Sequence, residues 1–149
     1  RASGCHHLIL RTAWVYSSRF ANFLRTMLRL GAEREELGVV ADQVGAPTTA
    51  RGLAEVTAAL LARADLLEGK RLGTFHCVHA GQTSWHGFAE AIFSRAVEAG
   101  LLPRAPRVRA IGTADYPTPA RRPPREAHGL ALPDWRLGLD SVIGELAAQ

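Results

Sequence analysis

Short apolar runs, divided by glycine, proline and polar residues, predict a mixed α/β chain. Buried strands are expected where apolar residues follow one another for a few positions. They lie at residues 7–10, 37–40, 74–78 and, more briefly, 108–111, and β-prone residues extend the first run through 12–16. Strands this short and isolated suit a lobe attached to a larger sheet.

Apolar residues at spacings of three and four predict helices between these strands. The helices run from Asn22 to Leu30, from a cap at Thr48 or Thr49 to about Leu67, from a cap at Ser84 to Gly100, and onward from near Asp134. Gly31 and Gly69 are further expected stops, and Trp85 and Trp135 lie on apolar stripes as core residues. The stretch from Gly112 to Pro133 holds five of the eight prolines, which predicts an extended loop.

The composition is that of one ordinary globular domain. The chain has 149 residues, of which 47% are apolar and 21% charged. Two cysteines, Cys5 and Cys77, are too few for a disulfide scaffold. No apolar run approaches the roughly 20 residues of a membrane helix, and the first residues lack the apolar core of a signal peptide. We therefore expect a cytoplasmic protein without a membrane partner.

The charge balance is modestly positive, with 18 basic and 14 acidic residues. Nucleic-acid-binding proteins usually gather their positive charge on one face. Here the dense basic stretch runs from Arg104 to Arg125 and is interrupted by prolines. We expect its arginines to meet the phosphate of a small ligand, and we expect no nucleic-acid partner.

Several catalytic signatures are missing from the chain. It has no glycine-rich phosphate loop, no G-K-[ST] and no G-x-S-x-G nucleophile elbow. Neither Tyr16 nor Tyr116 is followed by a lysine four residues later. The histidines and cysteines contain no C-x-x-C, and His76 and His79 would point to opposite faces of a strand. We therefore expect no catalytic residues and no structural zinc in these residues.

Several segments in order resemble one enzyme family. They are Arg11–Tyr16, Asn22-Phe23, Thr26–Leu30, Glu33–Leu37, Asp42–Thr48, His76, Gly81, Ser84-Trp85, Phe88-Ala89, Tyr116–Pro123 and Leu132–Trp135. Together they are similar to the dTDP-4-dehydrorhamnose reductases, which are extended short-chain dehydrogenases/reductases. The resemblance spans nearly the whole chain.

The resemblance implies the C-terminal part of a Rossmann-type protein about twice this length, with a mixed α/β substrate-binding lobe. Residues 1–149 would be the sugar-nucleotide-binding portion. The missing N-terminal half would hold NADPH and carry the catalytic tyrosine and lysine upstream of Arg1. The implied reaction reduces the C4 ketone of dTDP-4-dehydro-L-rhamnose to dTDP-L-rhamnose, a precursor of bacterial surface polysaccharide. The tyrosine would supply the proton and the lysine would lower its pKa.

The resemblance also nominates substrate-binding residues in this chain. Trp14 matches a family position that contacts the nucleotide-sugar, and a core aromatic is the alternative interpretation. Asn22 and Gln43 lie in loops that the fold would place near the cleft, where they bind the ligand or stabilise turns. Arg121 and Arg122 suit bidentate contacts with a diphosphate, with solvated loop charges as the alternative.

Two departures from the family pattern bear on these expectations. The segment after Pro123 is shorter than usual, which affects the packing of the lobe. Some members dimerise through Mg²⁺ held by two glutamates, and Glu145 fits one position while Arg51 occupies the other. A cation cannot serve as an oxygen ligand, so we expect no Mg²⁺, although a homodimer remains an expectation.

Two other functions stay open from the sequence alone. One is another sugar-nucleotide reductase or epimerase of the same superfamily. The other is a non-catalytic regulatory relative that keeps the fold. A tyrosine and a lysine four residues apart upstream of Arg1 would favour the enzyme.

Overall fold

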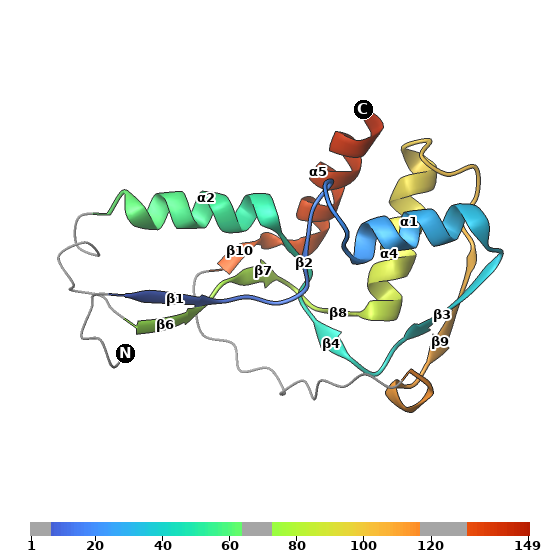
Figure 1. The fold of residues 1–149 in the computed structure, drawn as a ribbon, viewed down its shortest axis with the longest axis horizontal. Helices are drawn as coiled ribbons and strands as arrows, with labels where there is room; N and C mark the ends of the chain where they lie inside the picture. The colour runs from blue at the N-terminus through green and yellow to red at the C-terminus, as the bar shows by residue number, and fades with distance from the viewer. Residues whose placement is uncertain (1–6, 64–72, 117–130) are drawn as a thin grey trace.

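The computed structural model describes residues 7–63, 73–116 and 131–149, which form short parallel strand pairs and four helices (Figure 1). The helices are α1 (Phe23–Glu33), α2 (Ala50–Leu61), α4 (Trp85–Glu98) and α5 (Trp135–Ala147), with a 3₁₀ turn η1 (Thr113–Asp115). The strands are β1 (Leu8–Arg11), β2 (Val15–Tyr16), β3 (Glu36–Val40), β4 (Val44–Gly45), β5 (Thr48–Thr49), β6 (Gly73–His76), β7 (Val78–Ala80), β8 (Thr83–Ser84), β9 (Arg107–Ile111) and β10 (Ala131–Asp134).

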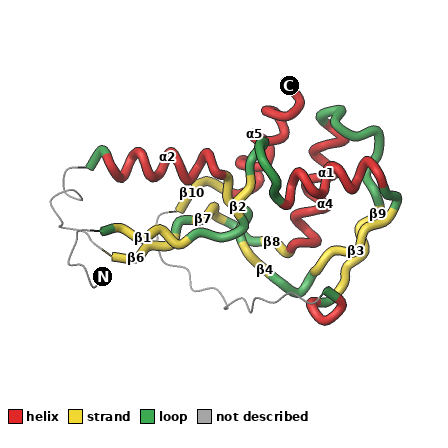
Figure 2. The backbone as a smooth tube through the Cα atoms, in the orientation of Figure 1, coloured by secondary structure: helices red, strands yellow, loops and turns green. Residues whose placement is uncertain are grey.

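The described strands pair two by two. The pairs β1–β6, β2–β5, β3–β9 and β7–β10 are parallel, and β4–β8 is antiparallel. Parallel partners need long crossover connections, so each pair joins distant parts of the sequence. Figure 2 shows the consequence, with groups of short strands between the helices and the paired strands lying side by side. The predicted mixed α/β fold is confirmed.

Each helix begins at a polar cap, and two of these caps, Thr49 and Ser84, are the ones that the sequence predicts. The capping oxygens accept backbone N–H bonds from residues in the first turn. The cap and donor pairs are Asn22 and Arg25, Thr49 and Gly52, Ser84 and Gly87, and Asp134 and Arg136. None of the described helices is long and apolar enough to cross a membrane.

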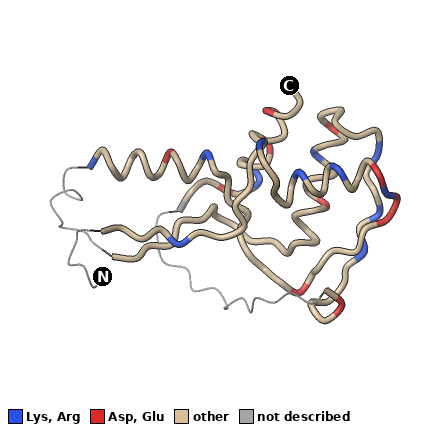
Figure 3. Tube along the Cα trace, viewed as in Figure 1, with Lys and Arg blue, Asp and Glu red and all other residues tan. Residues whose placement is uncertain are grey.

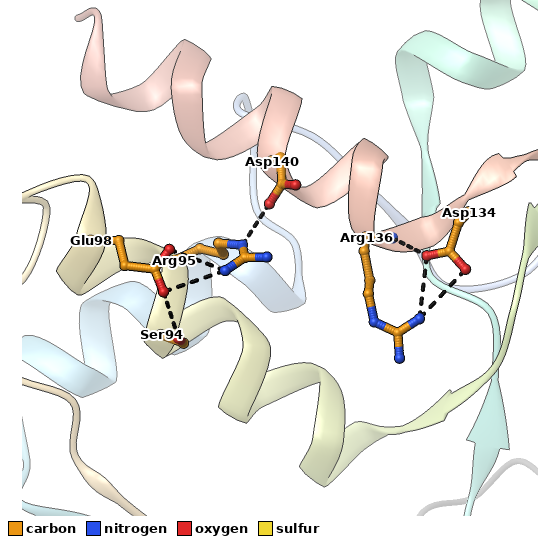
Figure 4. Close-up of polar contacts among 6 residues, drawn as sticks. All are labelled: Ser94, Arg95, Glu98, Asp134, Arg136 and Asp140. Carbon is orange, nitrogen blue, oxygen red and sulfur yellow. Dashed lines mark hydrogen bonds and ion pairs between the residues drawn. The ribbon is translucent and has the colours of Figure 1, made fainter.

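The hydrophobic core lies where α1, α4 and α5 meet β3. Phe88 and Ile92 of α4 are fully buried there, with Leu24 of α1 and Leu139 of α5. Trp135 is also buried, which confirms it as a core residue. At the surface Arg95 joins α4 to α5 through Asp140, at 2.6 Å (Figure 4). Exposed ion pairs of this kind add about 0–1 kcal/mol, so burial holds the helices together.

The other end of the molecule is less covered. There α2 runs alongside the β1–β6 pair (Figure 1). Within the described part of α2 only Gly52 is buried, and Leu61 is 61% exposed. The predicted end of this helix near Leu67 is wrong, because α2 ends at Leu61 with Ala62 as its C-cap; the predicted stop at Gly69 lies outside the described residues.

Three expectations about strands and loops are wrong in detail. Residues 12–16 are not continuous with β1, because the backbone turns at Trp14 and pairing resumes at Val15. The 74–78 strand is divided at Cys77, where the partner changes from β1 to β10. The 112–133 stretch is not wholly a loop, since it contains η1 and, after undescribed residues, β10. Pairing with a distant strand decides the last two cases, and local sequence does not carry that information.

Gly31 is not a helix stop. Helix α1 continues through it to Glu33. A Cβ atom at Gly31 would lie 2.6 Å from Cε1 of Phe93 in α4, which is too close for any real contact. The glycine is therefore needed for the close approach of two helices rather than for a turn.

We predict that Gly31→Ala destabilises the chain by about 1–3 kcal/mol, because the added methyl group overpacks the α1–α4 contact. Gly144 in α5 is the matched control, since a Cβ there meets nothing within 4 Å. Gly144→Ala should stabilise by about 0.5–1 kcal/mol through helix propensity. Urea unfolding measures both, and equal effects of the two substitutions would contradict the tight contact.

Candidate functional site

The backbone of Trp14 is strained. Its φ is +51°, a left-handed conformation that bulky side chains rarely adopt. Such conformations cost on the order of 1–3 kcal/mol and cluster at functional sites. The left-handed conformation of Trp14 is held by strand pairing next to it, because β2 pairs with β5 and the N–H of Thr48 donates to the Trp14 carbonyl at 3.1 Å. The half-buried indole is thereby presented just beyond the carboxyl end of β1.

The Trp14 ring is fixed on two sides. It stacks on Trp85 with the ring centroids 3.6 Å apart and the planes 14° from parallel. A Cβ at Gly45 would lie 2.6 Å from Cε2 of Trp14, so glycine lets β4 approach the edge of the indole. Trp85 was expected in the core, but it is half-buried and forms the platform for Trp14. The stack gives Trp14 one defined orientation.

Gln43 is held against this stack by its amide. Its Oε1 accepts a hydrogen bond from Nε1 of Trp85 at 3.2 Å, and its Nε2 donates to Oγ1 of Thr113 at 3.1 Å. Thr113 in turn donates its N–H and its hydroxyl to the carboxylate of Asp42, at 2.9 and 2.7 Å. These bonds from Thr113, the backbone bond first, hold the pKa of Asp42 below its ordinary value. The structure therefore brings Gln43 and Trp14 together through Trp85.

Asn22 is engaged by the protein itself. Its Oδ1 caps α1 by accepting from the N–H of Arg25, and its Nδ2 donates to the carbonyls of Ser17, Arg19 and Phe20. Phe23 follows it and packs against Trp85 with the ring centroids 4.6 Å apart. Asn22 thus shapes the loop beside the stack, and its contact with a ligand stays a prediction. Arg121 and Arg122 lie outside the described residues.

Sequence reasoning missed Trp85, Thr113 and Asp42 as parts of this site. The helical spacing of Trp85 favours a core residue, and it gives no sign of the indole N–H facing Gln43. A signal did exist for the other two. Asp42 follows β3 and Thr113 follows β9, and the carboxyl ends of parallel strands meet at one edge of a sheet.

Metal ligands do not gather in the described part of the chain, where no group of three His, Cys, Asp or Glu residues is placed to hold an ion. His79 is buried, with Nδ1 2.7 Å from the Pro133 carbonyl and Nε2 3.0 Å from Oγ1 of Thr49. The carbonyl can only accept, so Nδ1 carries a proton and donates it to Pro133. This histidine joins β5, β7 and β10 by its two hydrogen bonds.

The sequence profile of a known family, the RmlD substrate binding domain, matches residues 1–147. The chain belongs to this family. It is 45% identical to a dTDP-4-dehydrorhamnose reductase of Burkholderia thailandensis, over 99% of this chain and 54% of that protein. It is 42% identical to the Escherichia coli K12 protein of the same name, over 94% of this chain and 50% of that protein.

The fold comparison agrees with the RmlD substrate binding domain. A crystal structure of a dTDP-4-dehydrorhamnose reductase from Bacillus anthracis, in complex with NADP, superposes with a TM-score of 0.77 at 33% identity. The match covers 95% of this chain and 49% of that one. The chain therefore spans about half the length of the relatives it matches, and its fold is part of an extended short-chain dehydrogenase/reductase fold.

The magnesium site expected of some family members does not fit the residues of this domain. Nε and Nη2 of Arg51 bond to Oε1 of Glu145 at 3.0 and 2.6 Å, and the hydroxyl of Ser18 donates to Oε2 at 2.6 Å. Ser18 first and Arg51 next hold the pKa of Glu145 below its ordinary value. The Glu145 carboxylate is therefore already paired with a cation, the guanidinium of Arg51.

A cavity of about 570 Å³ adjoins this ion pair, away from the tryptophan stack. Arg51 and Glu145 form part of its wall, together with Tyr16 and Phe20. Phe20 is 88% exposed and its φ is +58°. Neither Trp14 nor Gln43 lines it, so this cavity and the sequence-predicted site are different places.

Proposed function

We propose that this chain is the sugar-nucleotide-binding part of a cytoplasmic dTDP-4-dehydrorhamnose reductase, and that Trp14 contacts the nucleotide-sugar. The complete enzyme would reduce the C4 ketone of dTDP-4-dehydro-L-rhamnose with NADPH to give dTDP-L-rhamnose for polysaccharide synthesis. The observation that carries the proposal is the strained Trp14 backbone, whose φ is +51°. A large residue keeps such a conformation where the direction of its side chain is needed.

The surroundings of Trp14 support a ring-binding role. Trp85 and Gly45 fix the indole before any ligand arrives, so little side-chain entropy is lost on binding. An indole offers a flat face to a base or sugar ring and one N–H donor. Ligands of open α/β folds bind outside the carboxyl ends of the strands, which is where Trp14 lies. Arg121 and Arg122 would complete the site by bidentate contacts with the diphosphate.

The remaining half of the protein would supply NADPH together with the catalytic tyrosine and lysine. Two features support this division. The relatives are about twice as long as the matched region, and one of them is a complex with NADP. In addition, the β1–β6 pair is incompletely covered, with Ile9 41% exposed, whereas parallel sheets are normally covered on both faces. We propose that the cofactor half packs against this pair.

We predict that Trp14→Ala weakens binding of dTDP by about ten- to a hundredfold, because stacking on a base is worth on the order of 1–3 kcal/mol. Gly45→Ala should also weaken binding, since the new methyl group would displace the indole while leaving it in the protein. Isothermal titration of the chain with dTDP measures both effects.

Gly31→Ala is the matched control. Its new Cβ would meet Phe93 at the same distance of 2.6 Å, but this clash lies between α1 and α4 and does not involve Trp14. It should lower the free energy of unfolding without changing dTDP affinity. A Trp14→Ala chain that loses about 3–5 kcal/mol of stability and keeps its affinity would refute the contact and leave Trp14 as a core residue.

We predict that the chain alone does not oxidise NADPH in the presence of dTDP-4-dehydro-L-rhamnose, because the NADPH site and the catalytic tyrosine and lysine would lie in the other half. Co-expression with the unmatched half of the Burkholderia thailandensis relative should yield a complex that does. NADPH absorbance follows the reaction, with that half alone as the control. Turnover by the purified chain would contradict the assignment of the cofactor and catalytic residues to the other half. An inactive one-to-one complex would contradict the proposed reaction.

We also propose that this protein uses Arg51 in place of Mg²⁺. Magnesium should leave the melting temperature and the sedimentation mass of the chain unchanged. Arg51→Glu places a second carboxylate beside Glu145, so Mg²⁺ should raise the melting temperature of that variant. Arg11→Glu, with the same change of charge on β1, should show no such response. A magnesium-dependent mass increase of the unaltered chain would contradict the proposal.

A further inference from the structure

A directional series of hydrogen bonds leads from a carboxylate to the tryptophan stack. The indole N–H of Trp85 can only donate, so the Gln43 oxygen must face it and the Gln43 NH₂ group must face Thr113. The Thr113 oxygen then accepts from Gln43, and its own proton goes to Asp42 at 2.7 Å. Each group in the series has one orientation that satisfies both neighbours.

The fold supports this series at its origin. Asp42 and Gln43 follow β3, and Thr113 follows β9, its parallel partner over the full register from Glu36 to Val40. The backbone N–H of Thr113 bonds to both oxygens of Asp42, at 3.1 and 2.9 Å. The two strand ends are therefore locked to each other before any side-chain contact with Trp85 is made.

The arginines on and before β9 pair with carboxylates other than that of Asp42. Arg107 and Arg109 are engaged with Glu36, and Arg104 with Glu35. Figure 3 shows these acidic residues of the α1–β3 turn beside the basic residues of β9, at the far end of the strands. The described contacts of Asp42 are thus the two donors of Thr113, and the series begins with a charge-assisted bond, which is stronger than a neutral one.

We propose that Thr113, with Asp42 and Gln43, is a positioning residue for the nucleotide-sugar site. Its hydroxyl fixes the Gln43 amide, the amide fixes the in-plane orientation of Trp85, and Trp85 stacks on Trp14. The inference rests on the proposed contact between Trp14 and the ligand, and it assigns the affinity for the ligand ring partly to a hydroxyl that is separated from that ring by three side chains.

Preorganisation is the physical reason for such an arrangement. A stacking residue that moves among rotamers must be ordered when the ligand binds, which reduces affinity. Sites work best where the contacting groups are held by the hydrogen bonds of a supporting layer. Gly45 and the strained backbone restrain Trp14 directly, whereas its partner Trp85 has its in-plane orientation set by Gln43.

The test compares Thr113→Val with Thr113→Ser. Valine keeps the shape and the backbone N–H of Thr113 but removes the hydroxyl, whereas serine keeps the hydroxyl. Because valine leaves the Gln43 amide without its acceptor, dTDP should bind about five- to tenfold more weakly, and serine should restore the affinity to within about twofold. Thr57→Val is the matched control, since it removes a threonine hydroxyl that bonds to the Leu53 carbonyl in α2.

A spectroscopic signature follows the stack without a ligand. Two indoles in contact give an exciton couplet in the circular dichroism spectrum, and Trp14→Ala defines the spectrum without it. Thr113→Val should reduce the couplet, and both Thr113→Ser and Thr57→Val should keep it. A role of Thr113 in stability alone would lower the melting temperature and leave couplet and affinity unchanged, which would overturn the inference.

The outcomes separate this inference from the proposed function. If Trp14→Ala weakens dTDP binding but Thr113→Val changes neither affinity nor couplet, the positioning role is wrong and the proposed function stands. If Trp14→Ala leaves dTDP affinity unchanged, the proposed function fails, and the positioning of a substrate site fails with it. If Thr113→Val does not fold, Asp42→Asn weakens the acceptor at the same point, and the same two measurements decide.

Discussion

The stack of Trp14 on Trp85 is the contact through which the strands, the helices and the site are joined. Trp14 lies in the turn between β1 and β2, and Trp85 is the first residue of α4. Phe23 of α1 packs on Trp85 and also on Phe88, with centroid separations of 4.6 and 5.6 Å. Phe88 meets Trp135 of α5 edge-on at 5.8 Å. One continuous set of aromatic contacts therefore extends from the site into the core.

This continuity explains how a strained residue is maintained. The cost of the left-handed backbone at Trp14 is on the order of 1–3 kcal/mol, and burial of several aromatic rings offsets it. The two ends of the molecule differ in how completely their apolar side chains are buried. The helices α1, α4 and α5 enclose a core around Phe88, whereas α2 and the β1–β6 pair keep apolar side chains such as Ile9 partly exposed. A well-packed end and an incompletely covered end fit the proposal that this domain is one half of a larger enzyme.

Local chemistry made much of the fold predictable from the sequence. The helix caps are single side chains that bond within one turn, so Thr49 and Ser84 were recognisable without knowledge of the tertiary structure. Gly31 was misread because glycine serves both helix ends and close helix contacts, and only the position of Phe93 distinguishes them. Strand β10 was hidden for a similar reason, since its partner β7 is distant in sequence.

The site was predictable in part. Family resemblance nominated Trp14 and Gln43, and in the structure Trp14 stacks on the ring of Trp85 while Gln43 bonds to its indole N–H. The role of Trp85 depends on which way its N–H points, and helical periodicity does not contain that information. For Arg121 and Arg122 the sequence remains the basis of the assignment.

The most direct test of this account is a ¹⁵N–¹H spectrum of the chain labelled at its three tryptophans and titrated with dTDP. Each indole N–H gives its own signal, so the site reports separately from the core. The account predicts that the Trp14 signal moves most, that Trp85 follows it through the stack, and that buried Trp135 stays in place. If saturating dTDP leaves the Trp14 signal unmoved, the proposed contact between Trp14 and the nucleotide is contradicted.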